Sequence, residues 1–287
     1  MLVSMKYLLD KAKDSDFAVG AFNASELTLF RAVIEEAEKL DSPVIVQASA
    51  GEFNFATRYF YDYVTKRAAV SNVPVALHLD HGHTVEEVIA AIQAGFTSVM
   101  IDGSMLPYEE NVKLTKKVVD IAHAVGVTVE GEIGTIGAIA NSDEGGVTNI
   151  TYTKPDEVVN FVSKTGVDCL AIAIGTAHGI YPKGYVPKLQ LDLLKEIKKV
   201  APVPLVLHGG SNNPDDEIAE ACRIGIAKVN ISSDMKYAYF KKLNEVYAET
   251  GGFVPSKVMT PAIDAAKEVI GQKMSLFNSV NKASLYR

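Results

Sequence analysis

The chain has few of the features that mark secreted, membrane-bound or nucleic-acid-binding proteins. It has only two cysteines in 287 residues, Cys169 and Cys222, and neither belongs to a CxxC pair. This favours buried free thiols in a reducing cytosol over a disulfide framework. The apolar runs fall well short of the roughly 20 residues that span a bilayer. The segment from Met1 to Phe17 also lacks the continuous apolar stretch of a signal peptide. We therefore expect a cytoplasmic protein.

The charge balance also narrows the choice of partners. The chain has 28 basic and 35 acidic residues, a net charge of −7, and no run of basic residues. Such a chain is a poor partner for nucleic acid or an anionic membrane. It can still bind an anionic small molecule where the site itself is locally positive. Apolar residues, by contrast, make up 48% of the sequence, which predicts a globular protein with a large core.

Short apolar runs alternate with longer amphipathic stretches along the whole chain. Eight runs are mostly continuous rather than alternating, as strands buried on both faces require. With no linker between them, they predict one (β/α)8 barrel of the TIM type over residues 1–287. Additional C-terminal helices are expected from Asp234 onward. A doubly wound open sheet is the alternative that element order alone leaves open. The predicted strands are Ala18–Phe22, Val44–Ala48, Val75–Leu79, Ser98–Ile101, Thr128–Ile133, Cys169–Ile174, Leu205–Leu207 and Lys228–Ile231. The predicted helices are Leu27–Leu40, Val85–Ala94, Glu109–Ala124, Asp156–Lys164, Leu191–Val200 and Asp215–Ile224.

One connection is unusually long and glycine-rich. It spans Gly134–Thr153 and follows the fifth predicted strand. Long loops in compact domains are commonly lids or binding loops, and barrel active sites lie at this end of the strands. We expect a lid here, with a simple surface insertion as the alternative.

Three histidines stand where predicted strands end. His81 follows the third strand, His178 the sixth and His208 the seventh, and each is followed directly by glycine. A single histidine of this kind is more often structural, but three at equivalent positions favour a shared role. Three imidazoles converging at the catalytic end of a barrel are the ligand set of a catalytic Zn²⁺ with one position open for substrate.

Carboxylates accompany these histidines. Asp80 directly precedes His81, where it would orient a ligand or move a proton. Glu132 ends the fifth strand as a fourth or alternate metal ligand. Asp102 ends the fourth strand, and for it a capping or supporting role is as plausible as direct ligation.

Two neighbouring strand ends are suited to an anion. One is His208-Gly209-Gly210-Ser211 and the other is Asn230-Ile231-Ser232-Ser233. Backbone N–H groups at loops and helix starts bind phosphate, and the loops after strands seven and eight are the usual phosphate site of this fold. Lys183 would add a cation. Ordinary turn and capping chemistry is the alternative interpretation.

Together these motifs resemble the class II, zinc-dependent ketose-bisphosphate aldolases, which include fructose-1,6-bisphosphate and tagatose-1,6-bisphosphate aldolases. The resemblance runs in order along nearly the whole chain. It rests on LHLDHGH (77–83), SVMIDGS (98–104), VEGEIGTIG (129–137), IAIGTAHG (172–179), PLVLHGGS (204–211) and KVNISSD (228–234).

The resemblance implies an activity and a role for each matching residue. The enzyme would reversibly cleave a phosphorylated ketose to dihydroxyacetone phosphate and an aldehyde through a zinc-stabilised enediolate. His81, His178 and His208 would bind zinc, Asp80 would be the acid/base, and Glu132 with Asp102 would form an alternative metal position. A place in carbohydrate metabolism such as glycolysis, a homodimer or homotetramer, and a monovalent cation near the phosphate are also implied. Implied substrate contacts are Asn23, Ser49, Gly179, Lys183, Gly209, Gly210, Ser211, Asn230, Ile231, Ser232 and Ser233.

The match departs from the family pattern in three places. The Glu-Asp pair of the family's mobile loop is replaced by Ala140-Asn141, with Asp143 and Glu144 nearby. The C-terminal Pro-Arg, whose arginine grips the distal phosphate, is replaced by Pro255-Ser256-Lys257. In the anion loops, Asn212 replaces the glycine that usually follows HGGS. Ser232 stands where the family usually has an acidic residue, Asn or Ala before a Thr. Because lysine does not reproduce the arginine fork, we hypothesise that the aldehyde half is not glyceraldehyde 3-phosphate.

Two other functions remain open at this stage. His81-Gly82-His83 forms an HxH pair, as in the amidohydrolase metal site, although there the pair follows the first strand. The altered loop also permits a non-catalytic sugar-phosphate sensor.

Overall fold

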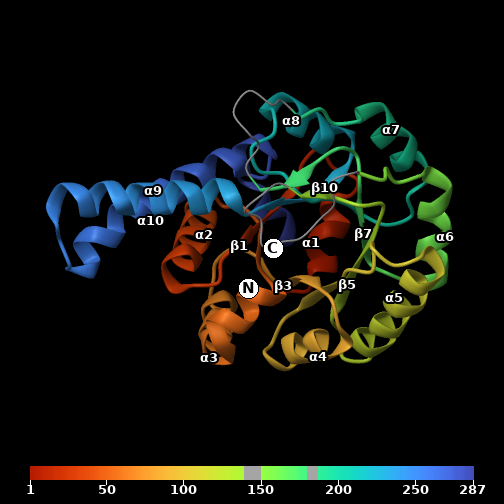
Figure 1. The fold of residues 1–287 in the computed structure, drawn as a ribbon, viewed down its shortest axis with the longest axis horizontal. Coiled ribbons are helices and arrows are strands. Elements are labelled where there is room, and N and C mark those ends of the chain that lie inside the picture. The colour runs from red at the N-terminus through yellow and green to blue at the C-terminus, as the bar shows by residue number, and fades with distance from the viewer. Residues whose placement is uncertain (139–149, 180–186) are drawn as a thin grey trace.

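The structure, a computed structural model, describes residues 1–138, 150–179 and 187–287 (Figure 1). Its centre is a closed barrel of eight parallel strands in the order β1-β2-β3-β4-β5-β7-β9-β10, with β10 pairing back onto β1. This confirms the predicted TIM barrel, because an open doubly wound sheet has no such closure. The barrel strands are β1 (Val19–Asn23), β2 (Val44–Ser49), β3 (Val75–Gly82), β4 (Ser98–Ile101), β5 (Thr128–Ile133), β7 (Cys169–Ile172), β9 (Leu205–Leu207) and β10 (Ile226–Ile231).

Each predicted strand falls on one of these strands, and the differences are at the ends. β3 runs three residues beyond its predicted end, because Gly82 pairs with Ile101 after a register shift. β7 ends two residues early, at Ile172, and the chain then turns through Gly175 at φ +117°. A short second sheet pairs β6 (Gly137–Ala138) with β8 (Ala177–His178).

Helices surround the barrel (Figure 1). The one between β2 and β3 was not predicted, and it is interrupted at Thr57, where φ is +66°. The N-terminal helix packs its apolar face, including Met5, Leu8 and Leu9, against the bottom of the barrel interior. The helices are α1 (Met5–Ala12), α2 (Leu27–Lys39), α3 (Ala50–Ala69), α4 (Val85–Gln93), α5 (Tyr108–His123), α6 (Pro155–Thr165), α7 (Leu191–Val200), α8 (Asp215–Ile224), α9 (Ser233–Thr250), α10 (Pro255–Leu276) and a 3₁₀ turn at Lys282–Tyr286.

The barrel interior changes character along its axis. At the amino-terminal end of the strands it holds small apolar side chains such as Ala76, Cys169 and Val206, in contact with α1. Toward the carboxyl end the buried residues become polar, among them Asp80 and His208. The hydrophobic core consists of this apolar layer and the contacts between the barrel and its surrounding helices. The interior at the carboxyl end of the strands can therefore hold polar groups.

The predicted C-terminal helices form an arm. α9 and α10 pack against each other and extend beyond the barrel past α2 (Figure 1). The turn that joins them lies at the far end of this arm, and Phe253 there is 90% exposed. No described helix is both long and apolar enough to cross a bilayer.

Candidate metal centre and active site

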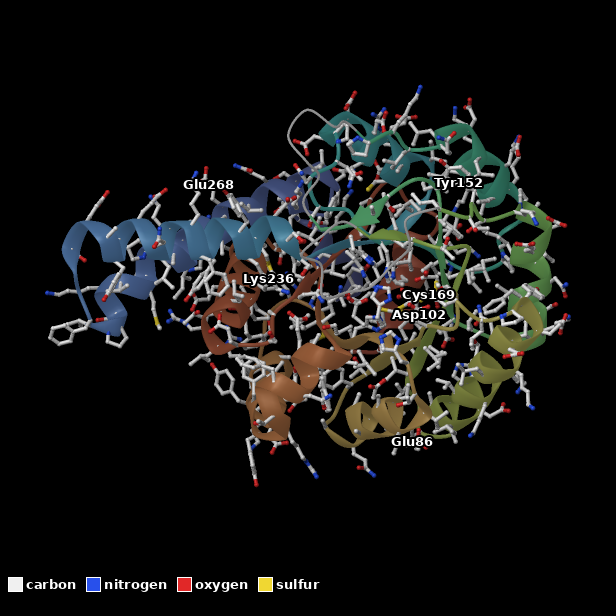
Figure 2. The ribbon with its side chains drawn as sticks, in the orientation of Figure 1. Glu86, Asp102, Tyr152, Cys169, Lys236 and Glu268 are labelled. Carbon is white, nitrogen blue, oxygen red and sulfur yellow. The ribbon has the colours of Figure 1, made fainter. Side chains whose placement is uncertain are left out.

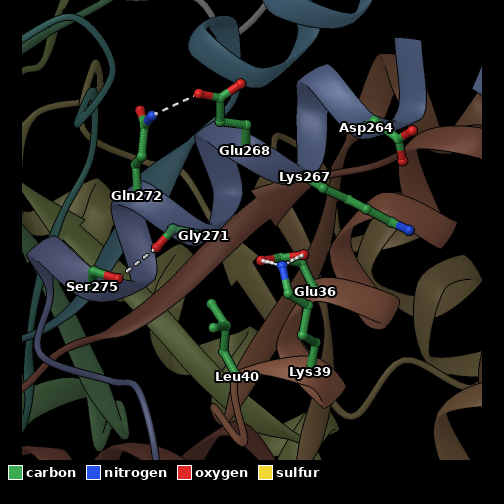
Figure 3. Close-up of a pocket in the computed structure, with 9 residues that line it drawn as sticks. All are labelled: Glu36, Lys39, Leu40, Asp264, Lys267, Glu268, Gly271, Gln272 and Ser275. Carbon is green, nitrogen blue, oxygen red and sulfur yellow. Dashed lines mark hydrogen bonds and ion pairs between the residues drawn. The ribbon is translucent and has the colours of Figure 1, made fainter. Parts of the chain in front are cut away.

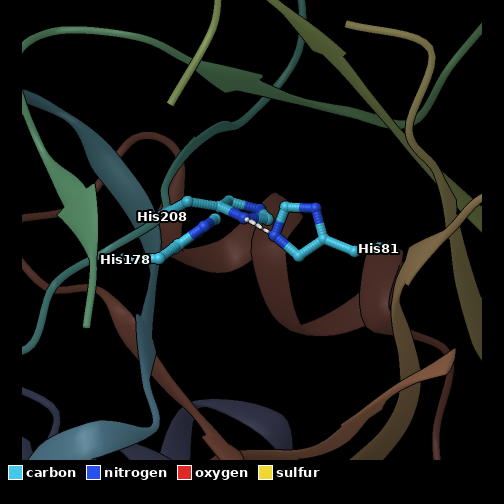
Figure 4. Close-up of side chains that lie close together, drawn as sticks. All are labelled: His81, His178 and His208. Carbon is cyan, nitrogen blue, oxygen red and sulfur yellow. Dashed lines mark hydrogen bonds between the residues drawn. The ribbon is translucent and has the colours of Figure 1, made fainter. Parts of the chain in front are cut away.

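The three strand-end histidines meet at the carboxyl end of the barrel (Figure 4). His81 lies near the end of β3, His178 at the end of β8, and His208 follows β9. One ring nitrogen from each lies within 4.8 Å of the others, and all three side chains are buried. The ring centroid of His81 is 4.9 Å from that of His178 and 4.7 Å from that of His208. Residues 30 to 127 positions apart in the sequence thus present nitrogen ligands to one point.

The backbone at this point is tightly constrained. His81 adopts φ +46°, an uncommon conformation for a residue with a side chain. Gly209, directly after His208, has φ +61°, and a Cβ there would lie 2.7 Å from the carbonyl oxygen of Ala177. Only glycine therefore lets the β9 end pack so closely against β8.

Asp102 and Asp80 determine the state of His81. The Nδ1 atom of His81 lies 2.9 Å from Asp102 Oδ2, and its Nε2 atom lies 2.9 Å from Nδ1 of His208. Asp102 is itself held by the backbone N–H of Ser104 at 3.0 Å and its hydroxyl at 2.7 Å. Burial alone would lower the pKa of His81, but the charges of Asp80 and Asp102 raise it to about 10. The surroundings therefore favour a positive charge at this point.

His208 is oriented from below by a buried ion pair. Its Nε2 atom lies 2.7 Å from Glu130 Oε1, and the other oxygen of Glu130 accepts a hydrogen bond from Lys228 Nζ at 2.8 Å. All three side chains are completely buried. Nδ1 of His208 is thereby the nitrogen that faces the centre, as in carboxylate–histidine–metal arrangements. Burial, aided by the nearby charge of His81, holds the pKa of His208 well below its usual range.

Asp80 is held in place by three amide groups. Asn23 and Gln47 each donate to its Oδ2 atom at 3.1 Å, and Asn230 donates to its Oδ1 atom at 3.1 Å. Burial would raise the pKa of this carboxyl, but neighbouring positive groups, His81 first, lower it to about 2. Asp80 is therefore an ionised carboxylate that is held in place beside the three histidines.

Glu132 provides a test of whether a cation fits. Its side chain is buried, and its Oε2 atom has no hydrogen-bond partner among the described residues. It forms a second close group with His81 and Asp102, also within 4.8 Å. Burial, together with the charge of Asp102, raises the pKa of Glu132 well above its usual range. A buried carboxylate with one oxygen that no described residue bonds, next to three imidazoles, suits a divalent cation, which would keep the carboxylate ionised.

The two predicted anion loops lie side by side. Ser211 Oγ accepts from the backbone N–H of Ser232 at 3.3 Å and of Asp234 at 3.4 Å, which ties the loop after β9 to the start of α9. Helix N-termini attract anions through their N–H groups and dipole. An expectation that all N–H groups of the two loops are free to bind an anion is wrong for Gly210, whose N–H donates to the Asn230 carbonyl at 3.0 Å, and for Ser232, whose N–H donates to Ser211 Oγ.

Some predicted positions cannot be placed at the site. Lys183 and the loop residues Ala140, Asn141, Asp143 and Glu144 lie outside the described residues. Most of the expected lid, 139–149, is therefore not described either. The segment Phe253–Lys257 lies at the far end of the arm, away from the carboxyl ends of its own barrel strands (Figure 1).

Sequence reasoning missed several polar residues that the structure brings to this end. They are Gln47, Glu52, Glu130, Lys228 and Lys236. The spacing of Glu130 and Glu132 was a usable signal, because residues two apart on a strand face the same side. The other residues gave no such signal, because their contacts join elements that lie far apart in the sequence.

Cavity size does not identify the site. The cavity at His81, Asp102, Glu132 and His178 is only about 30 Å³. A larger groove of about 660 Å³ lies between α2 and α10 (Figure 3). It is lined by the C-terminal end of α2, which faces the opposite end of the barrel from the histidines. Its polar groups largely pair with one another, as Lys39 does with Glu36. We therefore assign the chemistry to the histidine end, where barrel enzymes carry it.

Comparisons with known proteins point to one family along nearly the whole chain. The family model for class-II fructose-bisphosphate aldolase matches residues 3–282. The chain is similar to the YdjI aldolase from Escherichia coli K12, at 34% identity and a TM-score of 0.87, covering 99% of this chain and 100% of that one. It is similar to a putative fructose-1,6-biphosphate aldolase from Coccidioides immitis, at 28% identity and a TM-score of 0.88, covering 97% of each chain. A fructose-bisphosphate aldolase (Fba) from Campylobacter jejuni matches at 25% identity and a TM-score of 0.83, covering 98% of this chain and 96% of that one.

Proposed function

We propose, from the premise that this chain belongs to the class II fructose-bisphosphate aldolase family and is therefore a carbon–carbon lyase, that it reversibly cleaves a phosphorylated ketose to dihydroxyacetone phosphate and an aldehyde. The observation that carries the proposal is the meeting of His81, His178 and His208 beside the ionised Asp80. The anion loops at the start of α9 support a phosphorylated substrate.

The three histidines would hold one Zn²⁺, with Glu132 and Asp102 as an alternate position. A bound zinc ion would supply Lewis-acid stabilisation of the negative charge that develops on the ketone half as the bond breaks. No Schiff-base lysine is then needed. A monovalent cation near the phosphate is part of the same proposal.

The protein's own groups perform the remaining tasks. Asp80, fixed by three amides, would take the proton from the hydroxyl of the carbon that becomes the aldehyde, and return it in the synthetic direction. Ser211, Ser232 and Ser233, which lie together at the start of α9, would hold the phosphate of dihydroxyacetone phosphate. Asn23 and Asn230 reach Asp80 from β1 and β10, where they would also contact the substrate.

The hydrolase alternative is not favoured. An amidohydrolase-type site needs both histidines of the HxH pair at the metal. Here His81 is buried at the centre, while His83 is exposed and belongs to neither metal-sized group among the described residues. A non-catalytic sensor would not need an ionised Asp80 carboxylate that three amide groups hold in place.

The proposal is tested by exchange of a C3 proton of dihydroxyacetone phosphate with solvent, followed by NMR in deuterated buffer. We expect exchange that a chelator abolishes and added Zn²⁺ restores. His81→Ala should lose both metal binding and exchange. His83→Ala is the matched control, because this exposed neighbour should change neither. Absence of exchange in the metal-replete wild-type protein would refute the aldolase assignment.

The same proposal includes the setting of the enzyme. Its partners would be small sugar phosphates, in the cytoplasm, where the buried free thiols Cys169 and Cys222 stay reduced. A homodimer or homotetramer is proposed from the exposed aromatic side chains on the arm, which include Tyr237, Phe240 and Tyr247. Analytical ultracentrifugation tests this, and a monomer at micromolar concentration would contradict it.

A further inference from the structure

An ion pair that no part of the proposed chemistry uses lies beside Asp80. Glu52, in the first turn of α3, contacts Lys236, in the first turn of α9. Their side chains are 15% and 28% exposed. Lys236 lies at the barrel end of α9 (Figure 2). The pair therefore bridges the β2 and β10 sides of the barrel mouth.

Both partners are tied to the candidate active site. The Nδ2 atom of Asn23 donates to Glu52 Oε2 at 3.1 Å and to Asp80 Oδ2 at 3.1 Å, so the two carboxylates share one amide group. On the other side, Lys236 Nζ donates to Ser232 Oγ at 2.9 Å, at the anion loops. A short aldehyde whose oxygen lies at Asp80 would therefore reach Glu52 with its far end.

We infer that the Glu52–Lys236 pair is the specificity-determining element on the aldehyde side, and that it selects a short uncharged polyhydroxy aldehyde over a phosphorylated one. The inference rests on the proposed function and adds the class of acceptor. The carboxylate of Glu52 accepts hydrogen bonds from hydroxyl groups but repels a phosphate. The pair is neutral as a whole, but Glu52 is the partner that shares Asn23 with Asp80, whereas Lys236 is directed to Glu52 and to Ser232 at the anion loops.

The local structure does not require the charge of Glu52. Glu52 belongs to a capping box, in which its Oε2 atom accepts from the Ser49 backbone N–H at 3.1 Å and Ser49 Oγ accepts from the Glu52 N–H, and it also accepts a hydrogen bond from the Ser25 hydroxyl at 3.4 Å, which an amide oxygen can accept as well. Glutamine forms the same box. Glu52→Gln therefore removes the charge and leaves the start of α3 intact, whereas Lys236→Met removes the opposite charge.

The test measures kcat/KM in aldol synthesis with dihydroxyacetone phosphate as donor and two acceptors of one carbon skeleton, racemic glyceraldehyde and glyceraldehyde 3-phosphate. We expect the wild type to prefer glyceraldehyde. Glu52→Gln should shift the ratio toward the phosphorylated acceptor by about tenfold or more, and Lys236→Met should shift it away. Opposite shifts identify an electrostatic role, because a purely structural pair would respond in the same way to either change.

Glu35→Gln is the matched control, because Glu35 pairs with Lys267 between α2 and α10, away from the barrel mouth. It should leave the ratio unchanged. A wild-type preference for glyceraldehyde 3-phosphate, no turnover of either acceptor, or an unchanged ratio in Glu52→Gln would overturn the inference. So would an effect of Glu52→Gln only on the KM of dihydroxyacetone phosphate, which would assign the pair to the anion loops. Proton exchange of dihydroxyacetone phosphate needs no acceptor, so it reports independently whether the proposed function stands.

Discussion

Replacing Lys228 with methionine should leave a carboxylate uncompensated in the middle of the barrel. Glu130 and Lys228 are completely buried and 2.8 Å apart. At that separation, unit charges attract by about 6 kcal/mol when the effective dielectric constant is about 20. Part of this attraction offsets the cost of removing both groups from water. Loss of one partner from a buried pair typically costs about 3–5 kcal/mol.

We therefore expect Lys228→Met to lower the free energy of unfolding by about 3–5 kcal/mol, or the melting temperature by about 6–20 °C. The double variant Glu130→Gln/Lys228→Met should recover more than half of this loss, because no buried charge then lacks its partner. Lys267→Met, which breaks the partly exposed pair with Glu35, is the control and should cost about 1 kcal/mol or less. Urea unfolding followed by circular dichroism measures all four proteins.

Glu130→Gln also tests the link to the metal centre. Because Glu130 orients His208, its loss should weaken Zn²⁺ binding by about 10- to 100-fold, measured by competition with a chromophoric chelator. The reasoning fails if Lys228→Met is as stable as the wild type. It also fails if the double variant is no more stable than Lys228→Met.

Three further predictions concern the site and the thiols. Asp80→Asn should lower kcat for cleavage by about 10²- to 10⁴-fold while zinc content, measured by elemental analysis, stays at the wild-type level; equal loss of both would make Asp80 a structural residue. Because the pKa of His81 is raised to about 10, a proton competes with the metal below that pH, so zinc affinity should rise by up to about tenfold per unit between pH 7 and 9. Affinity that does not change with pH would contradict the carboxylate environment of His81. Burial raises the pKa of Cys222 to about 12, so about one in 10⁴ of these thiols is ionised at pH 8. Cys222 should resist iodoacetamide in the folded protein and react after unfolding, as mass spectrometry would show.

The amino-acid sequence by itself determined the barrel strands and the positions of the metal-binding candidates. Buried parallel strands need continuous apolar runs. Eight such runs could be recognised because each is short and is separated from the next by a longer stretch. The predicted strand positions also placed the three histidines together, since the carboxyl ends of parallel strands meet at one face of the barrel. The resemblance to class II aldolases added the roles, and the family comparison confirmed the family.

The tertiary structure alone decided which polar residues work together. A continuously apolar strand hides which residues face inward, so Glu130 and Lys228 gave no sign of pairing across 98 positions. The pairing depends on strand register and barrel closure, which bring β5 and β10 side chains to one interior layer. Likewise, Glu52 and Lys236 lie 184 positions apart and meet only because α3 and α9 begin at the same end of the barrel. Contacts of this kind depend on how the barrel closes, and no local sequence pattern predicts them.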